Sequence, residues 1–358
     1  MKKLALLGFV GLLLLACKDT DDTPTDDGYV ATPQNLEIPE LFNNLIDPPV
    51  IPEDNPQSVE GVALGKKLFF DPILSENNTQ ACASCHRPEN AFTDPRQFSV
   101  GINGDIGTRN SMPIFNAAWN YGQKFFWDGR SITLEAQALE PVIDPIEMHN
   151  TWENAVATLQ DDDDYPALFN LAFGTETITK ELTTKAISQF SRTLISANSK
   201  FDQHLLGTAT LTPEEENGMN VFMDETRGDC FHCHGNPNNP LWTDNIFHNN
   251  GLDAVITDKG LGAISGDPRE FGLFKSPSIR NLAFTAPYMH DGRFATLEEV
   301  INHYSEGLVY SETIDPLMKT VPEGGVQLSE EDKAALKAFL LSLSDPSFIN
   351  NPAFRPDN

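Results

Sequence analysis

Three stretches of the chain place apolar residues at helical spacing, residues 184–194, 212–222 and 329–340. Two of them begin with strong helix-start signals. Thr212-Pro213, followed by three glutamates, combines an N-cap residue, a proline at the first helical position and negative charge near the positive end of the helix dipole. Ser329, followed by three acidic residues, is a start of the same kind. Alternating strand patterns are weak throughout. The pattern therefore predicts a mainly α-helical protein with little strand.

The composition adds long loops to this picture. The chain has 358 residues, of which 24 are glycine and 25 are proline, and no solenoid-type repeat is visible. Its 40% hydrophobic residues are enough to build a buried core and exclude a disordered chain. The length fits about two domains of roughly 150 residues each.

The charge excludes two classes of partner. Asp and Glu number 52 and Lys and Arg 24, which gives a formal charge of −28. Nucleic acid needs a basic face, and anionic lipid attracts basic segments, so neither is an expected electrostatic partner. The same charge favours attraction of a basic protein.

The first residues have the pattern of an export signal. Lys2 and Lys3 precede an apolar run over 4–16, which is too short for a comfortable membrane-spanning helix. The run ends in LLAC at Cys17, which resembles the lipobox of bacterial lipoproteins; the alternative is an ordinary signal peptide that contains a cysteine. We expect a signal peptide over 1–16, lipidation of Cys17 and a flexible acidic tether over 17–39. The protein would then be an exported lipoprotein, held by its lipid anchor on the periplasmic side of the membrane or at the cell surface.

The other four cysteines form two C-x-x-C-H motifs. They are Cys82, Cys85 and His86, and Cys230, Cys233 and His234. This spacing is typical of c-type haem attachment, because two thiols three residues apart can bond one porphyrin while the adjacent His ligates its iron. A shared zinc site or two disulfides would also use four thiols, but neither explains the two histidines. The motifs predict two covalently bound haem c groups.

The two motifs lie about one domain length apart. We therefore expect two cytochrome-c-like, mainly helical domains, each binding one haem. The predicted boundaries are 40–207 for the first domain and 208–346 for the second, with a tail over 347–358.

Four further segments carry a family resemblance. They are GTRNSMP at 107–113, FWDGR at 126–130, PIEM at 145–148 and TAPYMHDGR at 285–293. In this order, with both haem motifs, the chain resembles the bacterial dihaem cytochrome c peroxidases, a family that includes the methylamine-dehydrogenase maturation enzymes (the MauG-like branch). The resemblance covers roughly residues 55–345.

The resemblance implies a division of labour between the haems. The first haem would react with peroxide, and the second would receive electrons and pass them on. Glu147 matches the distal acid–base glutamate, Gln137 a glutamine that positions the oxidant, and Trp127 the tryptophan between the haems. Without the resemblance, Glu147 and Gln137 would be interpreted as surface residues and Trp127 as a core residue.

The resemblance also implies a calcium site and two haem contacts. Asn110, Thr285 and Pro287 match the family's interdomain calcium site, whose oxygen ligands suit this hard cation. Arg109 and Arg130 could pair with haem propionates, because guanidinium groups match carboxylates in a bidentate manner. The alternative for both arginines is an ordinary surface ion pair.

Two positions depart from typical members of the family. Ile102 stands where a His caps the peroxidatic iron until the other haem is reduced, so we expect an open first haem that needs no prior reduction. Tyr304 stands where a Met ligates the second haem, and the maturation enzymes also have a Tyr there. The neighbouring candidates for ligands of the second iron are His303, Met289 and His290. Tyr304 ranks first, then His303 and Met289, because only the alignment register separates them.

The leading interpretation is an enzyme, a cytochrome-c peroxidase that reduces H₂O₂ to water with electrons from a small reduced cytochrome c or cupredoxin. A second interpretation is a MauG-like enzyme that uses H₂O₂ to oxidise residues of a protein substrate. A third is a membrane-tethered dihaem electron carrier without catalysis. Members of the family are often dimers, so a homodimer also stays open.

Overall fold

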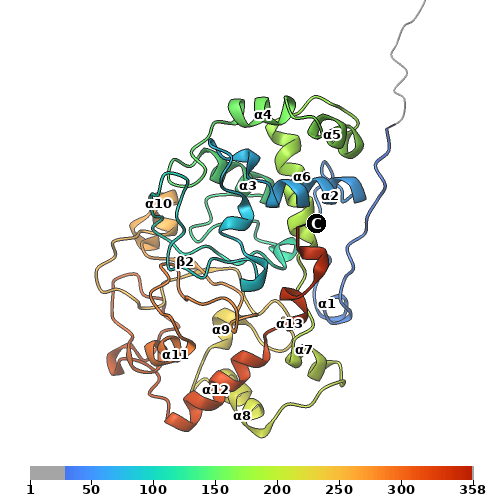
Figure 1. Ribbon diagram of the computed structural model, residues 1–358. Coiled ribbons are helices and arrows are strands. Elements are labelled where there is room, and N and C mark those ends of the chain that lie inside the picture. Colours follow the sequence, from blue (N-terminus) through green and yellow to red (C-terminus); the bar gives the residue numbers. More distant parts are fainter. Residues whose placement is uncertain (1–28, 357–358) are drawn as a thin grey trace, which may run out of the picture. The chain divides into compact units, whose positions relative to one another are not determined.

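Short helices joined by long loops make up most of the chain (Figure 1). The computed structural model describes residues 29–356, so the predicted signal peptide, Cys17 and most of the tether lie outside the described residues. Residues from Ala31 onward belong to one compact unit. The helices are α1 (Glu40–Leu45), α2 (Val59–Phe70), α3 (Leu134–Ile143), α4 (Trp152–Gln160), α5 (Tyr165–Phe173), α6 (Lys180–Thr193), α7 (Lys200–Leu205), α8 (Pro213–Met223), α9 (Phe231–His234), α10 (Leu261–Ser265), α11 (Leu297–Glu306), α12 (Glu330–Ser342) and α13 (Pro346–Ile349).

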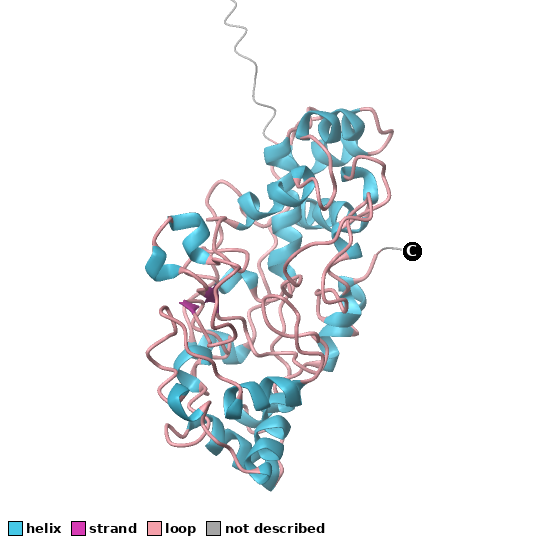
Figure 2. Cartoon of the chain, turned by 90° about the vertical axis from the view of Figure 1, so that its left-hand side faces the viewer, coloured by secondary structure: helices cyan, strands magenta, loops and turns pink. Residues whose placement is uncertain are grey.

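The mainly helical prediction is confirmed, since within residues 29–356 the strands are only β1 (Phe247–His248) and β2 (Phe274–Lys275). These pair antiparallel, Phe247 with Lys275 and His248 with Phe274. Figure 2 shows helices gathered toward two ends of the described unit, with loops and this small sheet between them. No helix in the described range is both long enough and apolar enough to cross a bilayer.

The three stretches with helical periodicity are helices α6, α8 and α12, and their start signals act as expected. The Thr212 hydroxyl accepts a hydrogen bond from the Glu215 N–H, and the Glu215 carboxylate accepts one from the Thr212 N–H. The Ser329 hydroxyl accepts from the Asp332 N–H. Each contact satisfies a backbone donor that the first turn of a helix leaves unpaired.

One hydrophobic core forms around α2 and α6. Phe69 of α2 contacts Phe190 of α6 with ring centroids 5.3 Å apart, and Phe92 lies 5.8 Å from Phe69. Phe348 of α13 and the following Phe354 also belong to this core, although they come from the end of the chain. Part of the predicted tail over 347–358 is therefore packed against the first half of the protein.

A second core forms around α8 and α12. Phe222 of α8 contacts Phe339 of α12 at 5.3 Å, and Trp242 lies edge-on to both rings. A smaller cluster joins the two halves, because Phe42 of α1 and Trp119 pack with Leu241. The domain boundaries at 207/208 and 346/347 stay a prediction.

The helix pairs of both cores cross at a glycine. A Cβ on Gly65 of α2 would come 1.9 Å from the Ala186 carbonyl oxygen of α6, and a Cβ on Gly218 of α8 would come 1.9 Å from the Ala335 oxygen of α12. Only glycine permits backbones to approach so closely.

Replacing Gly218 with alanine should therefore lower the free energy of unfolding by about 1–3 kcal/mol, because the added methyl group forces the helices apart. The denaturant midpoint of the helical circular dichroism signal measures this loss. Gly122→Ala is the control, since its nearest neighbour to a new Cβ lies 3.9 Å away. A Gly218→Ala midpoint equal to that of the control would contradict the expected clash.

Candidate functional site

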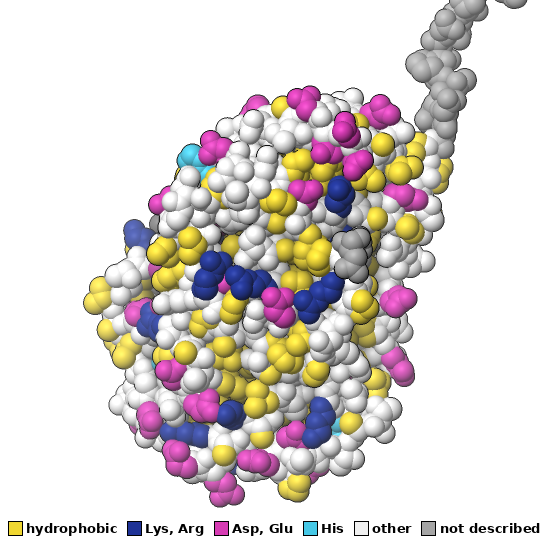
Figure 3. All heavy atoms as spheres, in the orientation of Figure 1, with side chains coloured by type: hydrophobic (Ala, Val, Ile, Leu, Met, Phe, Trp, Pro, Cys, Tyr) yellow, Lys and Arg dark blue, Asp and Glu magenta, His cyan; other side chains and the backbone are white. Residues whose placement is uncertain are grey.

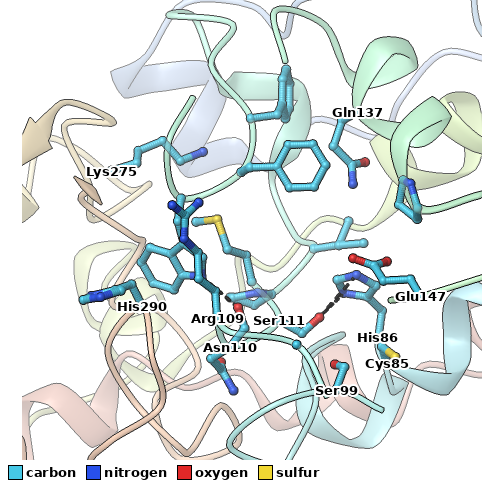
Figure 4. A pocket seen from close by; sticks show the side chains of 18 of the residues that line it. Cys85, His86, Ser99, Arg109, Asn110, Ser111, Gln137, Glu147, Lys275 and His290 are labelled. Atoms are coloured by element: carbon cyan, nitrogen blue, oxygen red, sulfur yellow. Dashed lines mark hydrogen bonds between the residues drawn. The ribbon is translucent and has the colours of Figure 1, made fainter. Parts of the chain in front are cut away.

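The first C-x-x-C-H motif opens into a cavity of about 970 Å³. Cys82, Cys85 and His86 line it, as do Gln137 and Glu147 on another segment. Figure 4 shows the Gln137 amide and the Glu147 carboxylate directed into the space beside His86. The structure thus brings the predicted haem-binding and catalytic residues of the first half into one cavity.

The contacts of His86 favour a neutral imidazole ring with one nitrogen available to a metal. Its Nδ1 lies 2.8 Å from the Phe92 carbonyl oxygen, to which it can only donate. A proton on Nδ1 leaves the lone pair on Nε2 for a metal. Burial also lowers the pKa of His86 and so disfavours the protonated ring. The Ser111 hydroxyl lies 3.4 Å from Nε2 (Figure 4).

Glu147 sits in the loop that follows α3. Its N–H donates to the Asp144 carbonyl oxygen, and its own carbonyl oxygen accepts from the Ile102 N–H, both at 3.0 Å. Burial, assisted by the charges of Asp144 and Glu140 and opposed by Arg130, raises the pKa of Glu147 to about 7. A carboxyl group with this pKa can both accept and return a proton near neutral pH.

Ile102 lies in the loop over 101–107 and is joined to Glu147 by the backbone hydrogen bond given above, but it is not among the residues that line the first cavity. Gly101 fits there because a Cβ would come 1.7 Å from the Ile146 carbonyl oxygen. An isoleucine side chain offers no ligand atom for iron. Whether this leaves the first haem open stays a prediction.

Trp127 lies between the first cavity and a second one, and lines both. Its indole N–H donates to the Asn110 carbonyl oxygen at 2.8 Å, and its carbonyl oxygen accepts from the Lys275 N–H at 2.9 Å. The side chain is only 8% exposed. Its position between the two haems stays a prediction, with which this placement is consistent.

The second C-x-x-C-H motif lines this second, smaller cavity of about 240 Å³. Cys230, Cys233 and His234 face it, and burial lowers the pKa of His234 to about 4, which keeps the ring neutral. Ser276, directly after β2, places its hydroxyl 3.4 Å from Nδ1 of His234. The Ser111 hydroxyl contacts His86 in a similar way.

The candidate ligands of the second iron are placed differently. Tyr304 on α11 and Met289 line the second cavity, whereas His303 does not. Nε2 of His303 lies 3.1 Å from the Asn250 carbonyl oxygen, and the residue is 6% exposed. Burial raises the pKa of Tyr304 to about 12, so its hydroxyl keeps its proton until a metal replaces it.

Arg109 and Arg130 already hold carboxylates of the protein. Arg109 pairs with both oxygens of Asp258 at 2.8 Å and with Asp128 at 2.6 Å. Arg130 pairs with Glu140 at 2.6 Å and with Asp128 at 3.2 Å. Both arginines line the first cavity. A contact of either with a haem propionate stays a prediction.

The predicted calcium residues Asn110, Thr285 and Pro287 all line the second cavity. The Asn110 amide nitrogen donates to the carbonyl oxygens of Arg96 and Gln97 at 3.0 and 3.1 Å, which orients its side chain. Over residues 29–356, no group of three or more His, Cys, Asp or Glu side chains is arranged to hold a metal ion. A calcium site would therefore depend on neutral oxygens and water, and it stays a prediction.

Both cavities fit a covalently attached haem. Each presents two unpaired thiols and one neutral imidazole to the same space. The thiols can form thioethers with the porphyrin, and the imidazole can ligate its iron.

Comparison with known proteins agrees with this chemistry. Residues 59–210 match the family described as di-haem cytochrome c peroxidase. The methylamine utilization protein MauG of Methylorubrum extorquens is 36% identical, over 84% of this chain and 83% of that protein. MauG of Methylophilus methylotrophus is 34% identical, over 74% and 76% of the two chains. The chain belongs to the di-haem cytochrome c peroxidase family.

The family contains members with different names. The cytochrome c peroxidase Ccp of Escherichia coli (strain K12) is 33% identical, over 87% of this chain and 63% of that protein. A crystal structure of a MauG-like protein associated with microbial copper homeostasis superimposes with a TM-score of 0.81 at 37% identity, covering 90% of this chain and 99% of that one. Membership of this di-haem family establishes haem as the cofactor and a peroxidase-type oxidoreductase as the class of enzyme.

Sequence reasoning missed a polar group beside the second haem motif. Both ring nitrogens of His248 contact carboxylates, Asp244 at 2.9 Å and Asp315 at 2.6 Å. Burial alone would lower the pKa of His248, but contacts with Asp244, Cys233 and Asp315 raise it to about 11. The sequence signal that could have indicated this polar group is the run His248-Asn249-Asn250, which follows the second haem motif.

Proposed function

We propose that the protein uses hydrogen peroxide to oxidise side chains of a protein substrate, as a member of the MauG-like branch of its family. The proposal depends most on Tyr304, whose side chain lines the second cavity on the helix where typical members carry a methionine ligand. An anionic oxygen ligand stabilises ferric iron, whereas a thioether raises the potential. A second haem of low potential suits the storage of oxidising equivalents better than the collection of electrons from a small carrier.

In the first cavity, a haem held by Cys82, Cys85 and His86 would supply the iron at which peroxide is reduced by two electrons. The Glu147 carboxylate takes a proton from peroxide and returns it to the departing oxygen, which leaves as water. The Gln137 amide, directed into the same space, orients the peroxide by hydrogen bonding (Figure 4). Trp127 passes electrons between the two cavities that it lines.

A peroxidase that draws electrons from a small reduced cytochrome c or cupredoxin is the second candidate. The 33% identity to the E. coli cytochrome c peroxidase and the acidic charge of the chain both favour it. An acidic protein attracts a basic donor over long range. On the face drawn in Figure 3, Lys and Arg side chains nevertheless gather across the middle, so such a donor would dock away from this patch.

The proposal includes export and membrane anchoring through Cys17, a calcium ion near Asn110, Thr285 and Pro287, and two haem domains divided near residue 207. An exported site is consistent with covalent haem attachment, which takes place after export in bacteria. Labelling with a radioactive fatty acid tests the anchor, and a Cys17→Ser variant should lose the label and leave the membrane fraction.

The ferric holoprotein should react with peroxide without prior reduction. Because Ile102 provides no ligand atom, the electron paramagnetic resonance spectrum should contain one high-spin and one low-spin ferric signal. One equivalent of H₂O₂ should change both signals within the mixing time.

Two low-spin signals that are inert to peroxide would contradict this expectation and favour either a reduction-gated peroxidase or an electron carrier. Steady-state oxidation of reduced cytochrome c separates the two enzymes. Fast turnover would favour the second candidate over the MauG-like one.

A further inference from the structure

Asn250 contacts three of the four side chains that the sequence leaves as candidate ligands of the second iron, namely Tyr304, Met289 and His303. Its amide nitrogen lies 3.0 Å from the Tyr304 hydroxyl and 3.5 Å from the Met289 sulfur. An amide nitrogen carries two hydrogens, so it can donate to both. The backbone carbonyl oxygen of Asn250 lies 3.1 Å from Nε2 of His303.

These contacts have different effects on the ability of the three side chains to ligate iron. The His303 nitrogen that meets a carbonyl oxygen must carry its proton, so it has no lone pair for a metal. The Met289 sulfur is a weak acceptor, and its longer contact of 3.5 Å holds it beside the Asn250 amide. Tyr304 receives a hydrogen bond on an oxygen that has further lone pairs, so it remains able to bind a metal.

The two residues that precede Asn250 fix the position of its backbone. His248 is clamped between Asp244 and Asp315, at 2.9 and 2.6 Å. It also belongs to strand β1, which pairs with the strand leading to Ser276 beside His234. The segment is therefore fastened to the second haem motif on one side.

Asn249 fastens the segment on the other side. Its amide nitrogen donates to the hydroxyls of Ser311 and Thr313, both at 3.0 Å, and its carbonyl oxygen accepts from the Asp315 N–H at 3.0 Å. The side chain is 3% exposed. With the two preceding residues anchored, the Asn250 amide is preorganised rather than free to follow its partners.

We infer that Asn250 is a positioning residue that selects the ligand of the second haem, by directing the Tyr304 hydroxyl into the cavity while it restrains Met289 and His303. The inference rests on the proposed ligation by Tyr304. A residue outside the haem motifs would thus decide whether the second iron has an oxygen or a sulfur ligand. The reduction potential of the second haem would be low with oxygen and high with sulfur.

The test replaces the amide donor in the holoprotein and observes the second haem directly. In Asn250→Leu the donor is lost at similar size, and in Asn250→Asp an acceptor replaces it, while the carbonyl contact to His303 remains in both. We expect the ferric low-spin signal of the second haem to shift, with a new methionine-ligated species in the near-infrared magnetic circular dichroism spectrum. Adding Met289→Leu should remove that species. Asn238→Leu, an exposed position four residues after His234, is the control and should leave both haem signals unchanged.

Tyr304→Phe, measured in parallel, separates the two claims. If Tyr304→Phe leaves the second haem signal unchanged, ligation by Tyr304 is wrong and the selection role falls with it. If Tyr304→Phe changes the signal but both Asn250 variants retain the wild-type signal, the selection role alone is wrong. A methionine-ligated species in the Asn250 variants together with a shift in Tyr304→Phe supports both, whereas a shift in the Asn250 variants without that species would contradict the selection role.

Discussion

Replacing Glu147 with glutamine should reduce the rate of peroxide consumption by about 10²–10⁴-fold, the usual contribution of a general acid–base group. Glutamine has nearly the same shape, but it cannot take a proton from peroxide or return one to the departing oxygen. The absorption spectra of both haems should stay unchanged, because Glu147 is not expected to ligate iron. Stopped-flow mixing of the ferric protein with H₂O₂ measures the loss.

The pH dependence of the wild-type reaction provides an independent check. Burial raises the pKa of Glu147 to about 7, and only the ionised form can accept a proton. The rate of reaction with peroxide should therefore rise as the pH increases through about 7 and level off above it. In Glu147→Gln this rise should disappear.

Glu153→Gln is the matched control, since Glu153 is an exposed carboxylate in the first turn of α4. It should keep the wild-type rate and pH profile. Unchanged peroxide turnover in Glu147→Gln would exclude the acid–base role, whereas loss of either haem spectrum would point to a structural role instead.

Replacing Asp202 with asparagine should lower the free energy of unfolding by about 3–5 kcal/mol, because it leaves the Arg280 charge buried without a counter-ion. Arg280 is 0% exposed and Asp202 is 0% exposed. Arg280 donates to both carboxylate oxygens of Asp202 and, at 2.7 Å, to the Pro240 carbonyl oxygen. Asp202 also accepts from the Ser199 N–H and hydroxyl at 2.7 Å.

Chemical denaturation of the holoprotein, followed by circular dichroism, gives the change in stability. Asp267→Asn is the control, because Asp267 pairs with Arg269 at the surface, where an ion pair contributes little. If the Asp202 and Asp267 variants unfold at the same denaturant concentration, the buried pair does not stabilise the fold as expected.

The sequence predicted those parts of the site whose chemistry is local. Each haem motif places two thiols and an imidazole within five residues, so covalent chemistry alone indicates the cofactor. Likewise, the helix starts at Thr212 and Ser329 depend on residues three positions apart. Such signals do not require knowledge of the tertiary fold.

Other parts depend on contacts between distant residues. Asn250 meets Met289 and Tyr304 from 39 and 54 positions away, so neither periodicity nor spacing identifies it. Arg109 reaches Asp258, 149 positions away. Glu147 was identified only through the family resemblance, because an isolated glutamate in a loop is usually a surface residue.

The position of the C-terminal residues determines when the hydrophobic core around α2 and α6 can be fully packed. Phe348 and Phe354 belong to the core built on α2 and α6, not to the neighbouring core of α8 and α12. Since a chain is synthesised from its N-terminus onward, the first core cannot be completed until the last residues have been made. A stop codon directly after α12 would leave the second core with all its own aromatic residues, and would open the core that packs against Cys82 of the first haem motif.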